Sequence, residues 1–142
     1  MEIRLGRVSD IPQITLVRTS VNENHLSVEQ MEEMGITEAS TAQMITASPC
    51  CWVAVVNAKV VGFSMVNNED GCLFAAFVLP DYEGQGIGSS LLEVAEEQLF
   101  KVHSLAWLET TKSSHAASFY RNKGWGNEKL VGPDYIRLEK TR

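Results

Sequence analysis

Three glycines, Gly84, Gly86 and Gly88, lie where an apolar segment passes into a stretch with helical periodicity. The segment Cys72–Leu79 is almost wholly apolar, which predicts a strand covered on both faces. From Ile87 onward apolar residues recur at the spacing of one helix face, so the glycines are expected at a helix start. The first N–H groups of a helix lack partners within it and carry about half a positive charge, which suits a phosphate or pyrophosphate. The alternative is a turn that uses glycine only for its tightness.

Two better-known glycine loops do not fit this stretch. The dinucleotide-binding loop has the spacing G-x-G-x-x-G and an acidic residue roughly 20 positions later, whereas the spacing here is G-x-G-x-G. The phosphate loop of NTPases needs Gly-Lys-Ser/Thr, and no lysine occurs between Lys59 and Lys101. Neither nucleotide-binding loop therefore accounts for the glycines.

Two segments together resemble the GNAT (GCN5-related) N-acetyltransferases. Glu83-Gly84-Gln85-Gly86-Ile87-Gly88 matches that family's motif A, Gln/Arg-x-x-Gly-x-Gly/Ala, at every position but the first. The segment 113–125, Ser-Ser-His-Ala-Ala-Ser-Phe-Tyr-Arg-Asn-Lys-Gly-Trp, is similar to the family's N-x-x-A-x-x-F/L-Y-x-x-x-G-F/W. The two segments stand in the family's order and spacing, and the resemblance covers roughly residues 72–125.

The resemblance implies acetyl-CoA as co-substrate and direct acetyl transfer to an amine; no metal is expected, since no cysteine and histidine cluster has the spacing of a metal site. Backbone N–H groups from Glu83 to Ser89 would hold the pyrophosphate. The strand end 77–79 would pair with the pantetheine arm and place its amides near the thioester oxygen. The residues that the resemblance assigns to the cofactor are Phe77, Val78, Leu79, Glu83, Gly84, Gln85, Gly86, Ile87, Gly88, Ser89, Ser113 and Tyr120.

Tyr120 occupies the position of the tyrosine that the family commonly uses as general acid towards the leaving thiolate. A phenol has an unperturbed pKa near ~10, so it holds a proton at neutral pH and can donate it. The alternative is that Phe119 and Tyr120 only pack the helix on the sheet, with the hydroxyl at the surface.

The sequence departs from the family's motifs at two positions. Glu83 replaces Arg or Gln, and its carboxylate would repel phosphates if it pointed inward. We expect its side chain to face water, with weakened or altered cofactor binding as the alternative. Ser113 replaces the usual Asn with a shorter hydrogen-bonding side chain.

The general base and the acceptor site are less well defined. Glu109 follows the glycine-rich helix at the end of a predicted strand and could accept a proton directly or through water; His25 and Glu23 are alternatives. An amine that binds already neutral needs no dedicated base. Residues 18–47 form the most irregular and polar part of the chain, where a substrate pocket is expected, with Asn22 and His25 as candidate contacts.

Local patterns predict the order of elements β-α-α-β-β-β-α-β-α-β-β, which is the order of the GNAT fold. Ser9-Asp10-Ile11-Pro12 resembles a capped helix start, Ser27–Gln30 a capping box, and Thr37 a further cap. Predicted strands are 2–8, 51–56, 60–66, 72–79, 105–109, 125–131 and 135–138, and a helix over 114–123 ends at Gly124. The fold class is therefore α+β: a mixed, mostly antiparallel sheet of about 6–7 strands with about 4 helices.

Composition limits the remaining classes. The 142 residues suit one domain, 1–142, and the net charge of −6 argues against nucleic-acid binding. No signal-peptide core or membrane-spanning run occurs, and the histidines are too scattered for a zinc site. Cys50, Cys51 and Cys72 are expected to be buried free thiols, which indicates a reducing, cytoplasmic location.

The prediction is an acetyl-CoA-dependent N-acetyltransferase that acts on a primary amine of a small molecule or peptide. The alternative is a catalytically silent module that binds acyl-CoA or has a regulatory role. The resemblance is compatible with a homodimer through the last strands or a sheet face, which the residues themselves do not demonstrate.

Overall fold

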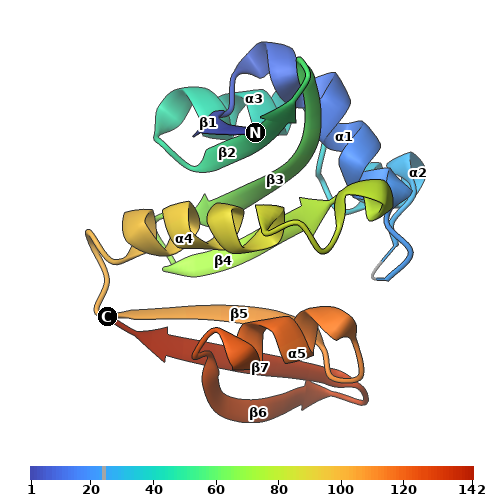
Figure 1. Ribbon diagram of the computed structural model, residues 1–142. Coiled ribbons are helices and arrows are strands. Elements are labelled where there is room, and N and C mark those ends of the chain that lie inside the picture. Colours follow the sequence, from blue (N-terminus) through green and yellow to red (C-terminus); the bar gives the residue numbers. More distant parts are fainter. Residues whose placement is uncertain (24) are drawn as a thin grey trace.

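The computed structural model describes residues 1–23 and 25–142. Within them the first strand is followed by three α-helices, three strands, a helix, a strand, a further helix and two final strands (Figure 1). The strands are β1 (Glu2–Leu5), β2 (Cys51–Val56), β3 (Lys59–Asn67), β4 (Cys72–Val78), β5 (Leu105–Thr111), β6 (Gly126–Gly132) and β7 (Tyr135–Thr141). The α-helices are α1 (Ile11–Ser20), α2 (Val28–Glu33), α3 (Glu38–Ala47), α4 (Ile87–Leu99) and α5 (His115–Asn122).

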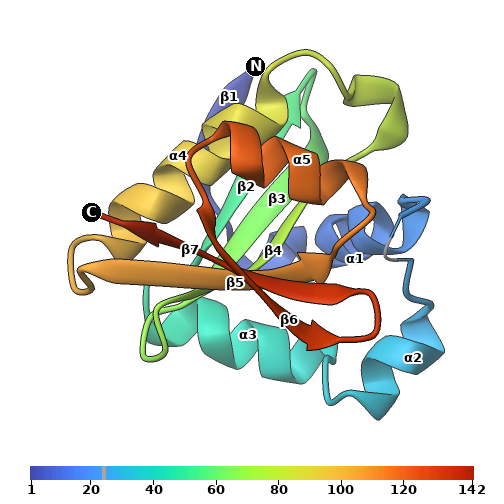
Figure 2. The ribbon, with the colours of Figure 1, turned by 90° about the horizontal axis from the view of Figure 1, so that it is seen from below.

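One seven-stranded sheet runs through the molecule in the order β1-β2-β3-β4-β5-β7-β6. Every neighbouring pair is antiparallel except β4 and β5, which confirms the mixed, mostly antiparallel sheet. The helices α4 and α5 cover one face, and α1 and α3 lie on the other (Figure 2). The predicted α+β class is therefore confirmed, with α3 as one helix more than the predicted order contained.

The parallel pair in the middle of the sheet is very short. Cys72 and Trp107 are its register pair, and the Trp107 N–H donates to the Gly71 carbonyl at 3.1 Å. Beyond this point β4 and β5 separate, with α4 packed on β4 and α5 on β5 (Figure 1). A sheet that opens between two strands exposes backbone groups along both edges, so this opening is where a ligand can enter the sheet.

Local hydrogen bonding confirms several predicted boundaries. Ser27 and Gln30 form the capping box of α2, and Thr37 caps α3 by accepting the Ser40 N–H at 3.1 Å. The β2–β3 hairpin turns on Asn57 and Ala58, both in the left-handed region. Two-residue turns of this conformation match the twist of antiparallel strands.

Asp10 lies in the predicted helix start, Ser9–Pro12, but its contacts are not those of a helix cap. Its carboxylate does not cap α1, and instead accepts two hydrogen bonds from the Arg4 guanidinium at 2.8 and 3.0 Å and one from the Arg7 N–H at 2.8 Å. The Arg4 hydrogen bonds hold the pKa of this buried carboxyl below its usual value, against the opposing effect of burial. Asp10 therefore ties the start of α1 to β1. Pro12 stands in the first turn of α1, as predicted.

The prediction that β4 is covered on both faces is wrong. Leu73 and Ala75 are buried, but Phe74 is 45% exposed and Phe77 and Val78 are only half-buried. The hydrophobic side chains in this half of the strand are therefore not all core residues, and several of them border cavities.

The three cysteines are buried free thiols, as predicted. Burial raises the pKa of Cys51 and of Cys72 to about 12, so both remain neutral thiols near pH 7. Such thiols are not activated nucleophiles, which agrees with direct transfer.

Candidate active site

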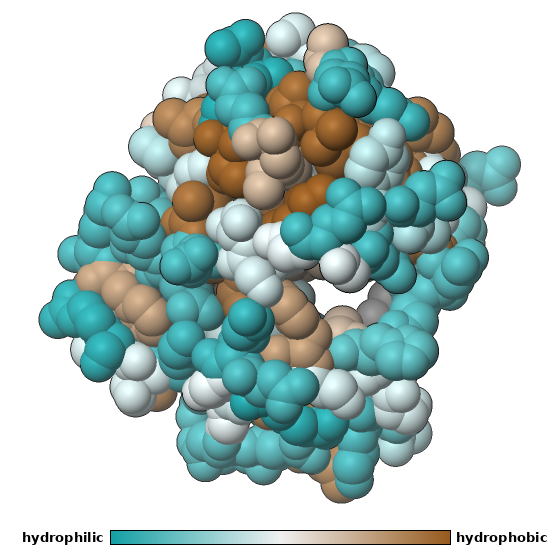
Figure 3. Space-filling view, viewed as in Figure 1, coloured by the Kyte–Doolittle hydropathy of each residue, from teal (hydrophilic) through white to brown (hydrophobic). Residues whose placement is uncertain are grey.

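A cavity of about 120 Å³ occupies the opening between β4 and β5. Its walls are the edge of β4, including Ala76 and Phe77, the side chain of Glu109 from β5, and Tyr120 from α5. A space-filling view shows the molecule hollowed between the half that carries α4 and the half that carries α5 (Figure 3). The separation of the two strands thus brings backbone and titratable side chains to one place.

Tyr120 is held firmly beside this cavity. Helix α5 begins after Ser114, whose hydroxyl accepts the Ala117 N–H at 3.1 Å and donates to the Thr111 carbonyl at 2.7 Å. The Tyr120 ring is 8% exposed and packs edge-on against Phe119 and Trp125. Burial raises its pKa above the usual value, which favours the protonated phenol. Within residues 1–23 and 25–142 its hydroxyl has no hydrogen-bond partner, so it can donate to a ligand in the cavity.

The three candidate bases occupy different places. Glu109 is exposed and lines the same cavity as Tyr120. Both carboxylate oxygens of Glu23 accept the His115 N–H at 3.0 Å, and one lies 3.2 Å from the His115 ring, so this carboxylate is bound at the start of α5. His25 lines a second cavity and lies 3.1 Å from the Val21 carbonyl. Of the three candidate bases, Glu109 is therefore the one that lines the same cavity as Tyr120.

The glycine-rich loop forms an open cradle. Gly84 and Gly86 have φ values of 75° and 83°, and a Cβ at either position would meet no atom within 4 Å. Helix α4 has no side-chain cap, and among the described residues no acceptor is found for the N–H groups from Gly84 to Ser89. These N–H groups are therefore available to an anion at the positive end of α4.

Glu83 stands at the edge of this cradle. Its side chain is exposed, as expected, and its N–H already donates to the Pro80 carbonyl at 3.3 Å within a turn at Pro80–Tyr82. The cradle of available N–H groups therefore begins at Gly84, one residue later than predicted.

The edge of β4 also differs from its prediction in detail. The Leu79 N–H donates to the Val61 carbonyl of β3 at 2.8 Å, so it does not face the opening. Backbone groups alternate between the two edges of a strand, so Phe77 also bonds towards β3 while Ala76 and Val78 point into the opening. Of the three predicted amides, 77 to 79, only that of Val78 is directed away from β3, towards the opening.

Two further predicted contacts lie away from the cavities. The Ser113 hydroxyl donates to the Asp134 carboxylate at 2.8 Å in the β6–β7 turn, so this side chain joins two loops. Asn22 is exposed and, within the described part of the chain, lines neither cavity. Of the two predicted acceptor contacts, the structure brings only His25 to a cavity.

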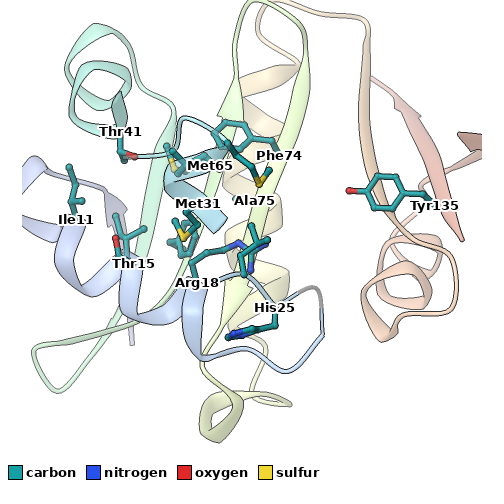
Figure 4. A pocket seen from close by; sticks show the side chains of 15 residues that line it. Ile11, Thr15, Arg18, His25, Met31, Thr41, Met65, Phe74, Ala75 and Tyr135 are labelled. Carbon is teal, nitrogen blue, oxygen red and sulfur yellow. The ribbon is translucent and has the colours of Figure 1, made fainter. Parts of the chain in front are cut away.

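The second cavity, of about 440 Å³, lies between α1, α2 and the strands β3 and β4 (Figure 4). Its lining is mostly hydrophobic: Ile11, Ile14, Leu26, Met31, Met34, Ile36, Phe63, Met65, Phe74 and Ala75. The remaining lining residues are Thr15, Arg18, His25, Thr41 and Tyr135. This size and this mixture of hydrophobic walls with a few polar groups are typical of small-molecule sites.

Arg18 and Tyr135 join the two cavities, because each lines both. The Arg18 guanidinium stacks on the Phe77 ring at 4.1 Å from its centroid. Burial lowers the pKa of Arg18, and Tyr135 partly offsets this, but an arginine remains charged. Neither residue was named as a candidate contact, although Arg18 is the first residue of the segment 18–47 in which a substrate pocket was expected.

Across the described ranges, 1–23 and 25–142, histidine, cysteine and acidic side chains form no group that could hold a metal ion. In the same part of the chain, no helix has both the length and the apolar character needed to cross a bilayer.

Comparisons with known proteins agree with this geometry. Residues 47–126 match the family described as acetyltransferase (GNAT) domain. Curated protein sequences contain no match. The structure is similar to that of the PaiA N-acetyltransferase of Thermoplasma acidophilum in complex with coenzyme A, with 18% identity, a TM-score of 0.77 and coverage of 99% of this chain and 98% of that one.

Two further solved structures show the same fold. One is the ribosomal-protein-alanine N-acetyltransferase of Brucella melitensis, with 21% identity, a TM-score of 0.72 and coverage of 100% of both chains. The other is the ribosomal-protein-S18-alanine N-acetyltransferase of Escherichia coli, with 22% identity, a TM-score of 0.70 and coverage of 99% of this chain and 92% of that one. The predicted fold is therefore confirmed over the whole chain.

Proposed function

Because this chain belongs to the GNAT acetyltransferase family, we propose that it transfers an acetyl group from acetyl-CoA directly to a primary amine of a small molecule or peptide. The observation that carries the proposal is that the N–H groups of Gly84–Ser89 have no acceptor among the described residues, a few positions after the part of β4 that lines the opening beside Tyr120. A phosphate group fits these N–H groups, and a reacting thioester fits the opening.

Acetyl-CoA would supply an activated acyl group with a thiolate as leaving group. The N–H groups at the start of α4 would bind its phosphates, and the exposed cations Lys59, beside Tyr82, and Lys123, beside Phe119, are additional candidates for this charge. The Val78 N–H would donate to the thioester oxygen, where negative charge develops during attack. A backbone donor is fixed before the reaction and reorganises little.

The chemical step then needs two proton movements. The amine attacks the acyl carbon, so the C–N bond forms, the C–S bond breaks and the sulfur takes the electron pair. Tyr120 would protonate the departing sulfur, since its buried phenol holds its proton. The proton lost by the amine would pass to Glu109, directly or through water, or to solvent if the amine binds already neutral.

The alternative remains a silent acyl-CoA-binding module, which would keep the cradle without transfer. We further propose that residues 1–142 act as one domain. The three buried thiols support a reducing compartment such as the cytoplasm.

A thermal-stability titration with acetyl-CoA, CoA and ATP tests cofactor binding. A ligand that binds only the folded state stabilises it by ~2.7 kcal/mol at 100 times its dissociation constant, so a shift with acetyl-CoA and CoA but not ATP is expected. Thiol release in the presence of a panel of amines then separates the enzyme from the silent module. Binding without release under any amine would favour the module, and no shift at millimolar acetyl-CoA would overturn the proposal.

A further inference from the structure

We propose that the acceptor is an α-amino acid with a long apolar side chain, whose carboxylate binds Arg18 and whose side chain fills the 440 Å³ cavity. This inference rests on the proposed acetyl transfer and specifies its substrate class. Its starting point is the position of Arg18 between the apolar cavity and the reaction cavity.

The walls of the larger cavity favour an apolar ligand group. Met31, Met34 and Met65 provide flexible, polarisable side chains, and Phe63 and Phe74 add aromatic surface. Burying a side chain the size of leucine, methionine or phenylalanine against such walls is favourable by the hydrophobic effect. A polar acceptor such as an aminosugar would lose hydrogen bonds to water without replacing them.

The charges of the cavity favour an anionic group and disfavour a second cation. Arg18 and His25 are its basic residues, and no carboxylate lines it among the described residues. A polyamine would bring further ammonium groups into this cavity with no carboxylate to pair with them. A carboxylate, in contrast, would meet a guanidinium that can form two parallel charge-assisted hydrogen bonds.

The geometry of Arg18 suits that role. Its guanidinium carbon lies over the Phe77 ring, 4.1 Å from the ring centroid, so the ring holds the charged group beside the cavity, and carboxylates bind along the edge of a guanidinium plane. Tyr135 reaches the same region from β7, with its hydroxyl directed towards the side where Arg18 lies (Figure 4). A phenol can donate an additional hydrogen bond to a carboxylate.

The connectivity of an α-amino acid links these contacts to the reaction. Its amine and its carboxylate are bonded to the same carbon, so a carboxylate on Arg18 holds the amine beside the smaller cavity. That cavity also contains Glu109 and Tyr120. The side chain, on the third bond of the same carbon, can then enter the apolar cavity.

The decisive experiment compares acceptors that differ only in the carboxylate. Thiol release from acetyl-CoA is measured with L-phenylalanine, L-methionine, their carboxamides and spermidine. We expect kcat/KM for the free acids to exceed that for the amides by about tenfold or more, as for loss of a charged hydrogen-bond pair. In Arg18→Gln this preference should disappear, whereas the exposed control Arg7→Gln should retain it.

A binding measurement keeps the inference testable if Arg18→Gln fails to fold. With wild-type protein saturated by CoA, L-phenylalanine should raise the melting temperature and L-phenylalaninamide should not. Faster release with an amide or with spermidine than with any amino acid would overturn this substrate class and leave acetyl transfer intact. If L-phenylalanine raised the melting temperature of the protein but acetyl-CoA did not, the amino-acid site would be supported and the proposed acetyl transfer would be overturned.

Discussion

The proposed cofactor region and the proposed acceptor cavity of this protein are built in opposite ways. The cofactor region comes from one continuous segment, 76–89, and its available groups are mostly backbone N–H groups. The acceptor cavity collects side chains from α1, α2, β3, β4 and β7, so its lining extends from Ile11 to Tyr135. The cofactor region relies on backbone groups, which every residue has. The acceptor cavity depends on the identity of its side chains.

This difference has consequences for substitution and specificity. A backbone site tolerates changes of side chain as long as the conformation survives, whereas a side-chain cavity changes its ligand with each residue. Substitutions in the two regions should accordingly affect different measured quantities.

The largest effect should come from the phenol of Tyr120, a side-chain group whose loss leaves the backbone cradle intact. Tyr120→Phe should lower kcat by about a hundredfold or more, the usual range for a lost general acid. The dissociation constant of acetyl-CoA should stay unchanged. Steady-state kinetics with a good amine, combined with calorimetric titration of acetyl-CoA, measures both quantities.

Two controls make the Tyr120 result interpretable. Because the hydroxyl has no partner among the described residues, its removal should leave the free energy of unfolding nearly unchanged. Burial raises the pKa of Tyr120 above ~10, so the wild-type kcat should show no loss of this acid up to that pH. Unchanged turnover in Tyr120→Phe would mean that another group, or water, protonates the thiolate.

The second-largest effect should come from Gly86→Ala, which tests whether acetyl-CoA binding depends on the backbone conformation of the glycine-rich loop. Gly86→Ala introduces a Cβ at a φ of 83°, where a non-glycine residue is strained by about 1–2 kcal/mol. We expect the dissociation constant of acetyl-CoA to rise by about tenfold or more, since the strain acts on the cradle itself. Thermal stability and acetyl-CoA affinity are measured on the same preparations.

Gly35→Ala is the matched control for this substitution. Gly35 has a φ of 81°, and a Cβ there would also meet no atom within 4 Å. Both variants should lose similar stability, but only Gly86→Ala should lose acetyl-CoA affinity. Equal affinity in the two variants would show that the cradle does not bind the cofactor.

Local patterns predicted most of the fold because their partners are close in sequence. The capping box of Ser27 and the turn at Asn57 depend on residues within a few positions, which a sequence displays directly. The cap predicted at Ser9 or Asp10 is not formed on α1, and the Asp10 carboxylate is bound by Arg4 of β1, a contact that no local pattern shows. For α3 the sequence indicated only the cap at Thr37; none of its residues is buried, so no clear apolar face marks the helix.

The same distinction explains which parts of the site were predictable. The glycine loop is contiguous, so its residues and its chemistry are visible together. Ser113 was assigned to the cofactor, but Asp134 in a distant turn binds its hydroxyl. Arg18 and Tyr135 come together only through the packing of α1 against the sheet and the pairing of β5 with β7, which no local pattern encodes.

The smallest effect concerns Glu83, the residue that departs from the family's motif. Its N–H is bound to the Pro80 carbonyl and its carboxylate is exposed, so the side chain should act only as a nearby negative charge. Glu83→Gln should therefore tighten acetyl-CoA binding about two- to fivefold at low ionic strength. The gain should fade in high salt, because exposed charges are screened.

Glu69→Gln is the control for Glu83→Gln, since it removes another exposed carboxylate, in the turn between β3 and β4. It changes the net charge by the same amount and should leave acetyl-CoA affinity unaltered. A much larger gain in Glu83→Gln that persists in high salt would mean that the carboxylate lies directly against the phosphates. Cofactor binding would then depend on the side chain of Glu83, at the first position of the glycine motif. The cofactor region would in that case resemble the acceptor cavity and would not be a purely backbone site.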